Sequence, residues 1–302
     1  MSPANVFASL HRDAHFLVRN YLREHLTLWI GVGLLALARH IAPLPALHLE
    51  AHHLVFSLLA IPFGWWVASV IHNAGHANFS SPWRNRLMGE LAGLYLGYGF
   101  TNFILIHGLH HAHSDGEDDP VSPEGTTFFQ YFTQPLRHPI ARARRTLRKL
   151  HGHRPDAART RLFEVLLFQA NLMMRVAFFY LLFGPNLFLS FYVVSIVSDV
   201  AILAHINFAC HRNHADGSVE VVNLSGNLYY RIANFVTTGG YFHKNHHLRP
   251  GLFDPRHFES DARPMLTMSP SRNTPPEKAI RDRSWLQRLK RKLDVDGIWG
   301  EA

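Results

Sequence analysis

The chain has 302 residues, of which 47% are hydrophobic, and its mean hydropathy is close to zero at -0.04. This balance excludes a protein made only of membrane spans, but it leaves room for a few apolar helices diluted by polar segments. A formal net charge of +8 does not indicate a nucleic-acid partner, because the basic residues gather beside apolar segments. The single cysteine excludes an internal disulfide and a cysteine-rich zinc site.

Four apolar segments approach the length that a bilayer-spanning helix needs, which is about 20 mostly apolar residues. Before the first of them, the apolar residues of the segment 1–25 recur at helical spacing between basic ones, which predicts a helix lying on the membrane surface. A solvated helix with one core face is the alternative. The predicted spans are residues 26–42, 54–72, 162–183 and 187–209.

A fifth apolar stretch, residues 87–106, is interrupted by Glu90, several glycines and Asn102. Its position relative to the membrane follows from the predicted topology of the other segments. The loop 137–161 carries nine Lys and Arg residues, which predicts that it is cytoplasmic. With four spans, both termini and the region 73–161 are then cytoplasmic too. The fifth stretch must therefore dip into the membrane and return, or lie on its surface.

No internal repeat divides the chain, and we expect one membrane-embedded domain over residues 1–302. Its tail, residues 263–302, is predicted to begin with a linker rich in Pro, Ser and Thr and to end in a basic amphipathic helix. The predicted fold class is all-α. It comprises four transmembrane helices, one re-entrant or interfacial segment and a cytoplasmic helical cap.

The chain contains 23 histidines, and four groups of them lie at or near the ends of the predicted spans. Residues at i,i+3 or i,i+4 on a helix share a face. We therefore expect His107 and His110 to meet one metal, with His111 turned toward a second. Nine imidazoles are too many for one zinc ion, which takes about four ligands. The nine are His72, His76, His107, His110, His111, His211, His243, His246 and His247, with Asn207 four residues before His211.

The order HxxxH, HxxHH, NxxxH, HxxHH, with spans between the second and third groups, resembles the membrane fatty acid desaturase and hydroxylase superfamily. HGLHHAHSDGEDDP and YFHKNHHLRPG are similar to two of its histidine boxes, and the resemblance covers about residues 54–258. It implies that the nine histidines ligate two irons and that Asn207 holds a metal-bound water. Imidazole alone suits several metals, so the choice of iron rests on the resemblance.

The resemblance also implies an oxidase of lipid-like chains that uses O2 as co-substrate, with its active site on the cytoplasmic side of the membrane. Loss of two hydrogens gives an alkene, and oxygen transfer gives an alcohol. Electrons would come from a separate ferredoxin, rubredoxin or cytochrome. An acyl-chain desaturase is the first hypothesis. The alternatives are a hydroxylase or ketolase of alkanes, carotenoids or other lipids, a decarboxylase forming terminal alkenes and, in another class, a metal transport or storage protein.

Several polar residues lie near these groups but outside the pattern. His113 and His214 are expected at the surface or behind the ligands, and His205 could replace a ligand. One of Asp115, Asp118 and Asp119 could orient a ligating histidine, although an exposed acidic turn is the alternative for each.

Two charged residues, Arg175 and Asp199, lie inside predicted spans, where charges usually face a cavity or each other. Folding the chain at Pro185 brings them to similar depth. They are therefore predicted to form an ion pair or to line a substrate tunnel, together with aromatic residues that include Tyr98 and Phe103.

Overall fold

The computed structural model describes residues 15–116, 118–123, 126–133 and 157–268, with four residues nearer the N-terminus. The predictions for the basic loop up to residue 156 and for the tail beyond residue 268 lie outside these residues. The described chain is mostly helical. Its helices are α2 (Phe16–Ile41), α3 (Ala51–Gly75), α4 (Pro82–Tyr95), α5 (Phe100–His113), α6 (Phe128–Thr133), α8 (Ala157–Leu187), the π-helical η1 (Phe188–Val193), α9 (Val194–Cys210), α10 (Leu228–Val236), α11 (His243–Leu248) and the 3-10 turn η2 (Pro255–His257).

Helix α2 comprises parts of two elements that were predicted to be separate, the surface helix and the first span. It runs without a break from Phe16 to Ile41, so the predicted boundary between a surface helix ending at residue 25 and a span beginning at residue 26 is wrong. No proline lies between Phe16 and Pro43, and Pro43 then ends the helix because proline disfavours a helical conformation at the preceding residue.

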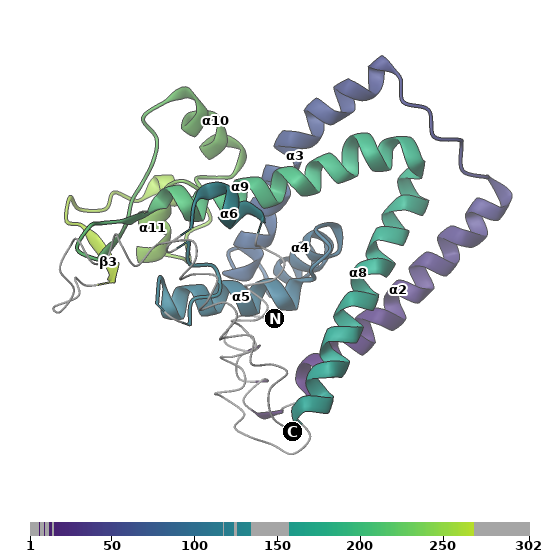
Figure 1. Ribbon diagram of the computed structural model, residues 1–302, viewed down its shortest axis with the longest axis horizontal. Helices are drawn as coiled ribbons and strands as arrows, with labels where there is room; N and C mark the ends of the chain where they lie inside the picture. The colour runs from purple at the N-terminus through teal and green to yellow at the C-terminus, as the bar shows by residue number, and fades with distance from the viewer. Residues whose placement is uncertain are drawn as a thin grey trace.

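Two helical segments of the described chain are long and apolar enough to cross a membrane, namely Ala51–Gly75 and Arg159–Cys210. The second contains both the third and the fourth predicted span. Its backbone leaves the helical region at Gly184, where φ is +72°, a conformation that glycine adopts without strain. Figure 1 shows the chain turning sharply here, so that α8 and α9 form a V. The arrangement of four spans stays a prediction.

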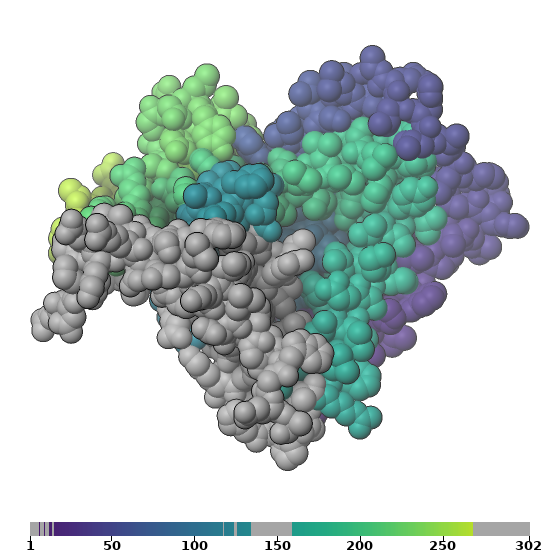
Figure 2. All heavy atoms as spheres, viewed as in Figure 1, coloured from purple at the N-terminus to yellow at the C-terminus, as the bar shows by residue number. Residues whose placement is uncertain are grey.

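The V of α8 and α9 packs against the two long helices before it, with α2 along α8 and α3 along α9 (Figure 1). Their outer faces carry many large apolar side chains that are more than half exposed, which is unusual for a protein surrounded by water. In Figure 2 these long helices and the cap around α10 form separate lobes, with a notch between α10 and α3. The exposed residues include Leu26, Trp29, Ile30, Leu34 and Leu37 on α2, and Leu54, Val55, Leu58 and Leu59 on α3.

The stretch 87–106 turns back on itself as part of two helices, α4 and α5. Gly97 and Gly99 make the turn between them with φ of +83° and +77°. The helices approach closely, since a Cβ at Gly93 would lie 2.3 Å from the backbone nitrogen of Phe100. The return brings His107 back beside the end of α3, although the depth of the stretch in a membrane stays a prediction.

The cap contains a small antiparallel sheet, so the all-α fold class holds only for most of the chain. The strands β1 (His211–Asn213), β2 (Val219–Val221) and β3 (Met265–Met268) pair in the order β1-β2-β3. The predicted linker that begins at residue 263 is therefore partly a strand. A strand of four residues that pairs with a distant part of the chain leaves no recognisable alternating pattern in the sequence. This is why the sequence predicted a linker here and not a strand.

The predicted ion pair between Arg175 and Asp199 is wrong. The buried guanidinium of Arg175 instead donates to the carboxylate of Glu24 on α2 and, at 2.7 Å, to the carbonyl oxygen of Gly97. Because α8 and α9 diverge from Gly184 (Figure 1), the two residues face different neighbours. Both carboxylate oxygens of Asp199 are buried and have no hydrogen-bond partner among the residues that the structure describes.

Candidate metal centre

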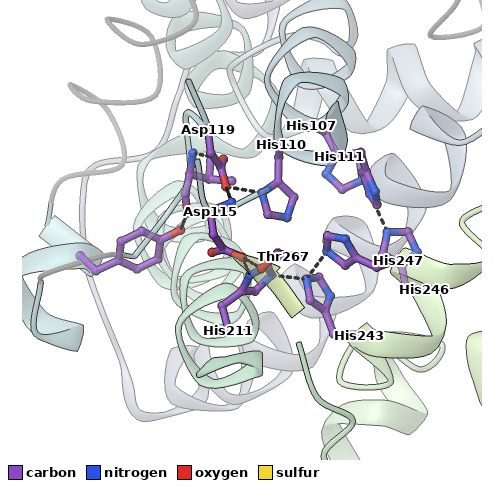
Figure 3. Close-up of polar contacts among 12 residues, drawn as sticks. His107, His110, His111, Asp115, Asp119, His211, His243, His246, His247 and Thr267 are labelled. Carbon is purple, nitrogen blue, oxygen red and sulfur yellow. Dashed lines mark hydrogen bonds and ion pairs between the residues drawn. The ribbon is translucent and has the colours of Figure 1, made fainter. Parts of the chain in front are cut away.

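Nine histidines converge where four segments of the chain meet, and Figure 3 shows those from α5, β1 and α11. The end of α3 and the residue after it supply two of them, α5 supplies three, the first residue of β1 supplies one and α11 supplies three. Separation in the sequence reaches 175 residues between His72 and His247, so the fold rather than local structure creates the cluster.

Eight of the nine histidines form two groups of four. In each group, one ring nitrogen per histidine lies within 4.8 Å of the corresponding atoms of the other three. The first histidine set consists of His72, His76, His107 and His246, and the second histidine set consists of His110, His211, His243 and His247.

Within each set the Nε2 atoms face one another. In the first set, the Nε2 atoms of His76 and His107 lie 2.6 Å apart. In the second set, the Nε2 atoms of His211 and His243 lie 3.0 Å apart. Nε2 of His110 is buried and has no hydrogen-bond partner within the described chain. Lone pairs that converge in this way suit a cation bound among them.

His111 lies between the two sets. Its Nε2 is 3.2 Å from Nε2 of His107 and 2.9 Å from Nε2 of His246. The ring of His111 also stacks at a tilt on the ring of His247, with the centroids 4.6 Å apart. The ninth histidine therefore contacts both sets, so that all nine histidines form one cluster.

The spacing within each HxxHH box distributes its histidines over both sets, which corrects the sequence prediction. His107 and His110 were expected to share a metal, but they belong to different sets. The Nε2 atoms of His107 and His111 are neighbours instead. In α11, His243 and His247 likewise share the second set while His246 joins the first. Four residues turn a helix by about 400°, closer to a full turn than the 300° of three residues, so the i,i+4 pairs align.

Two buried carboxylates hold histidines of the second set (Figure 3). Nδ1 of His110 lies 2.9 Å from Asp119, and Nδ1 of His211 lies 2.7 Å from Asp115. Asp119 is itself fixed, because it accepts the backbone amides of Asp115 and Val121. A carboxylate at Nδ1 keeps the proton on that nitrogen and leaves Nε2 free to bind a metal.

Burial favours the uncharged form of several histidines of the centre. It lowers the pKa of His76 to about 4, with help from the nearby charge of His110. Burial, followed by repulsion from neighbouring histidines, also lowers the pKa of His107 and His246, and of His243 and His247 in the second set. A metal ligates the neutral imidazole, so the lowered pKa values of these histidines favour the protonation state that metal binding needs.

The family model for the fatty acid desaturase matches residues 50–257. This chain belongs to the fatty acid desaturase family. The match includes all nine histidines, Asp115 and Asp119. No curated protein and no solved structure gave a significant match. Membership, together with the two long apolar helices, indicates a membrane oxidoreductase.

The remaining predicted residues of this desaturase-family protein lie around the centre. Asn207 is one turn before His211, and its backbone carbonyl accepts the amide of His211; its role through a water stays a prediction. His205 is outside both sets and lies in hydrogen-bond contact with the hydroxyl group of Tyr241. His113 is exposed, and His214 is partnered by Glu220 at 3.2 Å, as expected for residues outside the centre.

The acidic turn after α5 contributes two aspartates to the site, although only one was expected to orient a histidine, and the contact of Thr267 was not predicted. Both Asp115 and Asp119 contact ligand candidates. The hydroxyl group of Thr267 on β3 donates a hydrogen bond to the carboxylate of Asp115, which lies 152 residues earlier in the sequence. The DxxxD spacing after the HxxHH box was a usable signal for the carboxylates. A lone threonine in a segment that resembles a linker carries no such signal.

Proposed function

We propose that this protein is an O2-dependent di-iron oxidase in a membrane and that it desaturates acyl chains. The observation that carries the proposal is the pair of four-histidine sets joined by His111, in a chain of the fatty acid desaturase family. Two sets with eight imidazoles, plus a ninth between them, match two metal ions rather than one.

The residues fit iron, which imidazole ligands suit. Each set would hold one ion through Nε2 atoms, with His111 at the junction and Asn207 reaching the second set through a water. Bound iron supplies the activation of O2 and the removal of hydrogen from an unactivated C–H bond. The protein's own part is to exclude water by burial, to keep the imidazoles neutral and to orient His110 and His211 through their aspartates.

The surroundings support a lipid-like substrate. The centre lies at the ends of α3 and α9, two long apolar helices, so an apolar chain lying between membrane helices has a short way to the histidines. We place the centre and both termini on the cytoplasmic side, because the loop 137–161 is rich in Lys and Arg. Electrons come from a separate ferredoxin, rubredoxin or cytochrome.

Other outcomes of the same chemistry stay open as alternatives. The same site could hydroxylate or oxidise alkanes, carotenoids or other lipids to ketones, or decarboxylate fatty acids to terminal alkenes, since the choice depends on how the substrate lies. Metal transport is disfavoured, because its ligands would follow a path along the spans, whereas these nine histidines gather in one cluster at the ends of α3 and α9.

Metal analysis of the detergent-purified full chain tests the proposal. We expect about two irons per chain in the wild type and a loss of iron in His111→Ala and His246→Ala. The matched control is His214→Ala, which removes an exposed histidine outside both sets and should keep both irons. A product screen by mass spectrometry then separates alkene from alcohol. Wild-type protein without iron, or with iron that both variants retain, contradicts the proposal.

A further inference from the structure

Helix α10 in the cap has an apolar face that the described chain leaves exposed. The face consists of Leu228, Ile232 and Phe235, which lie at i, i+4 and i+7 and therefore share one side of the helix. These side chains are 70%, 49% and 75% exposed, respectively. The other side of α10 is packed, since Ala233 and Asn234 are buried. Large apolar side chains that are exposed together on an anchored helix mark an interaction surface.

Helix α10 is fixed beside the last part of α3. The ring of Tyr229 on α10 meets the ring of Trp65 on α3 edge-on, with 6.1 Å between the centroids. Just after α10, the hydroxyl group of Thr238 bonds the hydroxyl group of Ser69 and accepts a hydrogen bond from Asn73 at 3.3 Å. These contacts to α3 set the level at which the apolar face of α10 lies along the membrane helices.

The exposed apolar surface of α3 ends at this same level. Large apolar side chains are exposed on α3 from Leu54 to Trp66, whereas every residue from Val67 to Gly75 is buried or half-buried. Helix α3 is long and apolar enough to cross a membrane, so its exposed part is the surface that lipid chains would contact. The apolar face of α10 therefore lies where the lipid-facing surface of α3 stops.

The residues at this junction are of the kinds found where a membrane meets water. Trp65 and Tyr229 are in contact, and the neighbouring Trp66 is exposed. Tryptophan and tyrosine are enriched at membrane–water interfaces. Arg231, the only charged residue of α10, is exposed and directly precedes Ile232. Its alkyl stem can lie along apolar surface while its guanidinium reaches lipid phosphate groups.

A second short helix, α6, has an exposed apolar side chain at a similar level. Phe128 of α6 contacts the ring of His205 on α9 at 5.5 Å between centroids, and Tyr229 of α10 contacts the same ring at 5.5 Å. Phe129, the next residue of α6, is 73% exposed. Both short helices pack against α9 (Figure 1). Apolar groups on two separate helices at one level suit a lipid surface, which meets every side of the molecule at the same depth.

We propose that α10 lies in the membrane surface on the side of the histidines, with Leu228, Ile232 and Phe235 inserted among the lipid chains. Such a helix buries its apolar face about 5–10 Å into the boundary between headgroups and acyl chains. His72 follows Trp65 by seven residues, or about 10 Å by the helical rise, so α10 sets the depth of the metal centre relative to the lipid chains. The placement is independent of the metal and of the reaction.

Quenching of a fluorescent label by lipids tests this placement. The full chain is reconstituted in phosphatidylcholine bilayers and labelled with NBD at Phe235→Cys or at Leu228→Cys; the native Cys210 is buried and should not react. Phosphatidylcholine with a nitroxide close to the headgroup should quench both labels about twofold, because the labels lie at that depth. Lipid with a nitroxide near the chain end should quench them less. Both positions are exposed, and the second keeps the test valid if one variant does not fold.

Two further labelled positions are the controls. Leu58→Cys, on the exposed surface of α3, should be quenched more by the nitroxide near the chain end. Asp261→Cys, at an exposed carboxylate of the cap outside α10, should be quenched by neither lipid. Quenching at position 58 without quenching at positions 228 and 235 overturns the proposal and indicates that another protein or a second copy covers the face. No quenching at any of these positions overturns both the proposal and the placement of the chain in a membrane. Iron content is measured separately, so failure of the di-iron proposal leaves this result unchanged.

Discussion

The two histidine sets contain the same number of the same ligand, yet they differ in the groups that contact the Nδ1 atoms of these histidines. In the second set, Asp119 and Asp115 contact Nδ1 of His110 and His211, and three of its four histidines are buried. In the first set only His246 is fully buried, the other three histidines are half-buried, and no described carboxylate contacts a member. A carboxylate orients its histidine and raises its basicity. If each set binds one iron, as proposed, we expect the second set to hold its iron more tightly than the first.

The largest expected effect comes from removing a supporting charge. Asp119→Asn keeps the shape of the side chain but replaces the carboxylate at Nδ1 of His110 with a neutral amide. We expect iron affinity at the second set to fall about 10- to 100-fold, the usual cost of losing such a partner. Elemental analysis after dialysis against a chelator should find about one iron per chain.

The control for this change is Asp261→Asn, which alters an exposed carboxylate paired with Arg263. It should keep both irons. If Asp119→Asn keeps both as well, the carboxylate does not distinguish the sets and the comparison fails.

A second prediction concerns the order in which the irons leave. The wild type should lose iron to a chelator in two phases, with the first set released about tenfold faster, because the support of a carboxylate is worth at least a factor of ten. His72→Ala should remove the fast phase, and Asp115→Asn should accelerate the slow one. Absorbance of the iron–chelator complex follows both. A single phase in the wild type contradicts the unequal sites.

The third prediction uses pH. In the metal-free protein, burial holds the pKa of His76 at about 4, below the ordinary 6.5, so the unfolded state binds protons first as pH falls. Stability is therefore constant above about pH 6.5 and declines below it. His76 alone should cost about 1.4 kcal/mol at pH 5.5, which lowers Tm by roughly 3–6 °C.

Thermal unfolding of the metal-free chain between pH 7.5 and 5.5 measures this decline. His76→Asn should reduce it, and loading with iron should suppress it, since metal competes with protons for the same nitrogen. His214→Asn, at an exposed histidine, is the control. An unchanged Tm across this range in the metal-free protein contradicts the prediction.

The nine histidines and the long apolar segments were predictable, because histidine spacing and hydropathy are local properties of the sequence. The way in which the nine histidines divide into two sets was not predictable. Whether His110 joins His107 or His211 depends on where α11 and β1 lie, which no spacing records. The sequence indicated that the chain turns near Gly184 and Pro185. It did not indicate the V shape that separates Arg175 from Asp199, because that shape depends on packing against α2 and α3.

The smallest effect tests how far the support behind the second set extends. Thr267 on β3 donates its hydroxyl hydrogen to Asp115, the carboxylate that holds His211. Thr267→Val removes this hydrogen bond with little change in shape. A single hydrogen bond contributes about 0.5–1.5 kcal/mol, so the slow phase of iron release should accelerate about 2- to 10-fold while the fast phase stays unchanged. Ser218→Ala, whose hydroxyl group bonds Asp216 in the neighbouring turn, should change neither phase. Acceleration of both phases in Thr267→Val would mean that β3 stabilises the whole cap, and the two sets would then share their support.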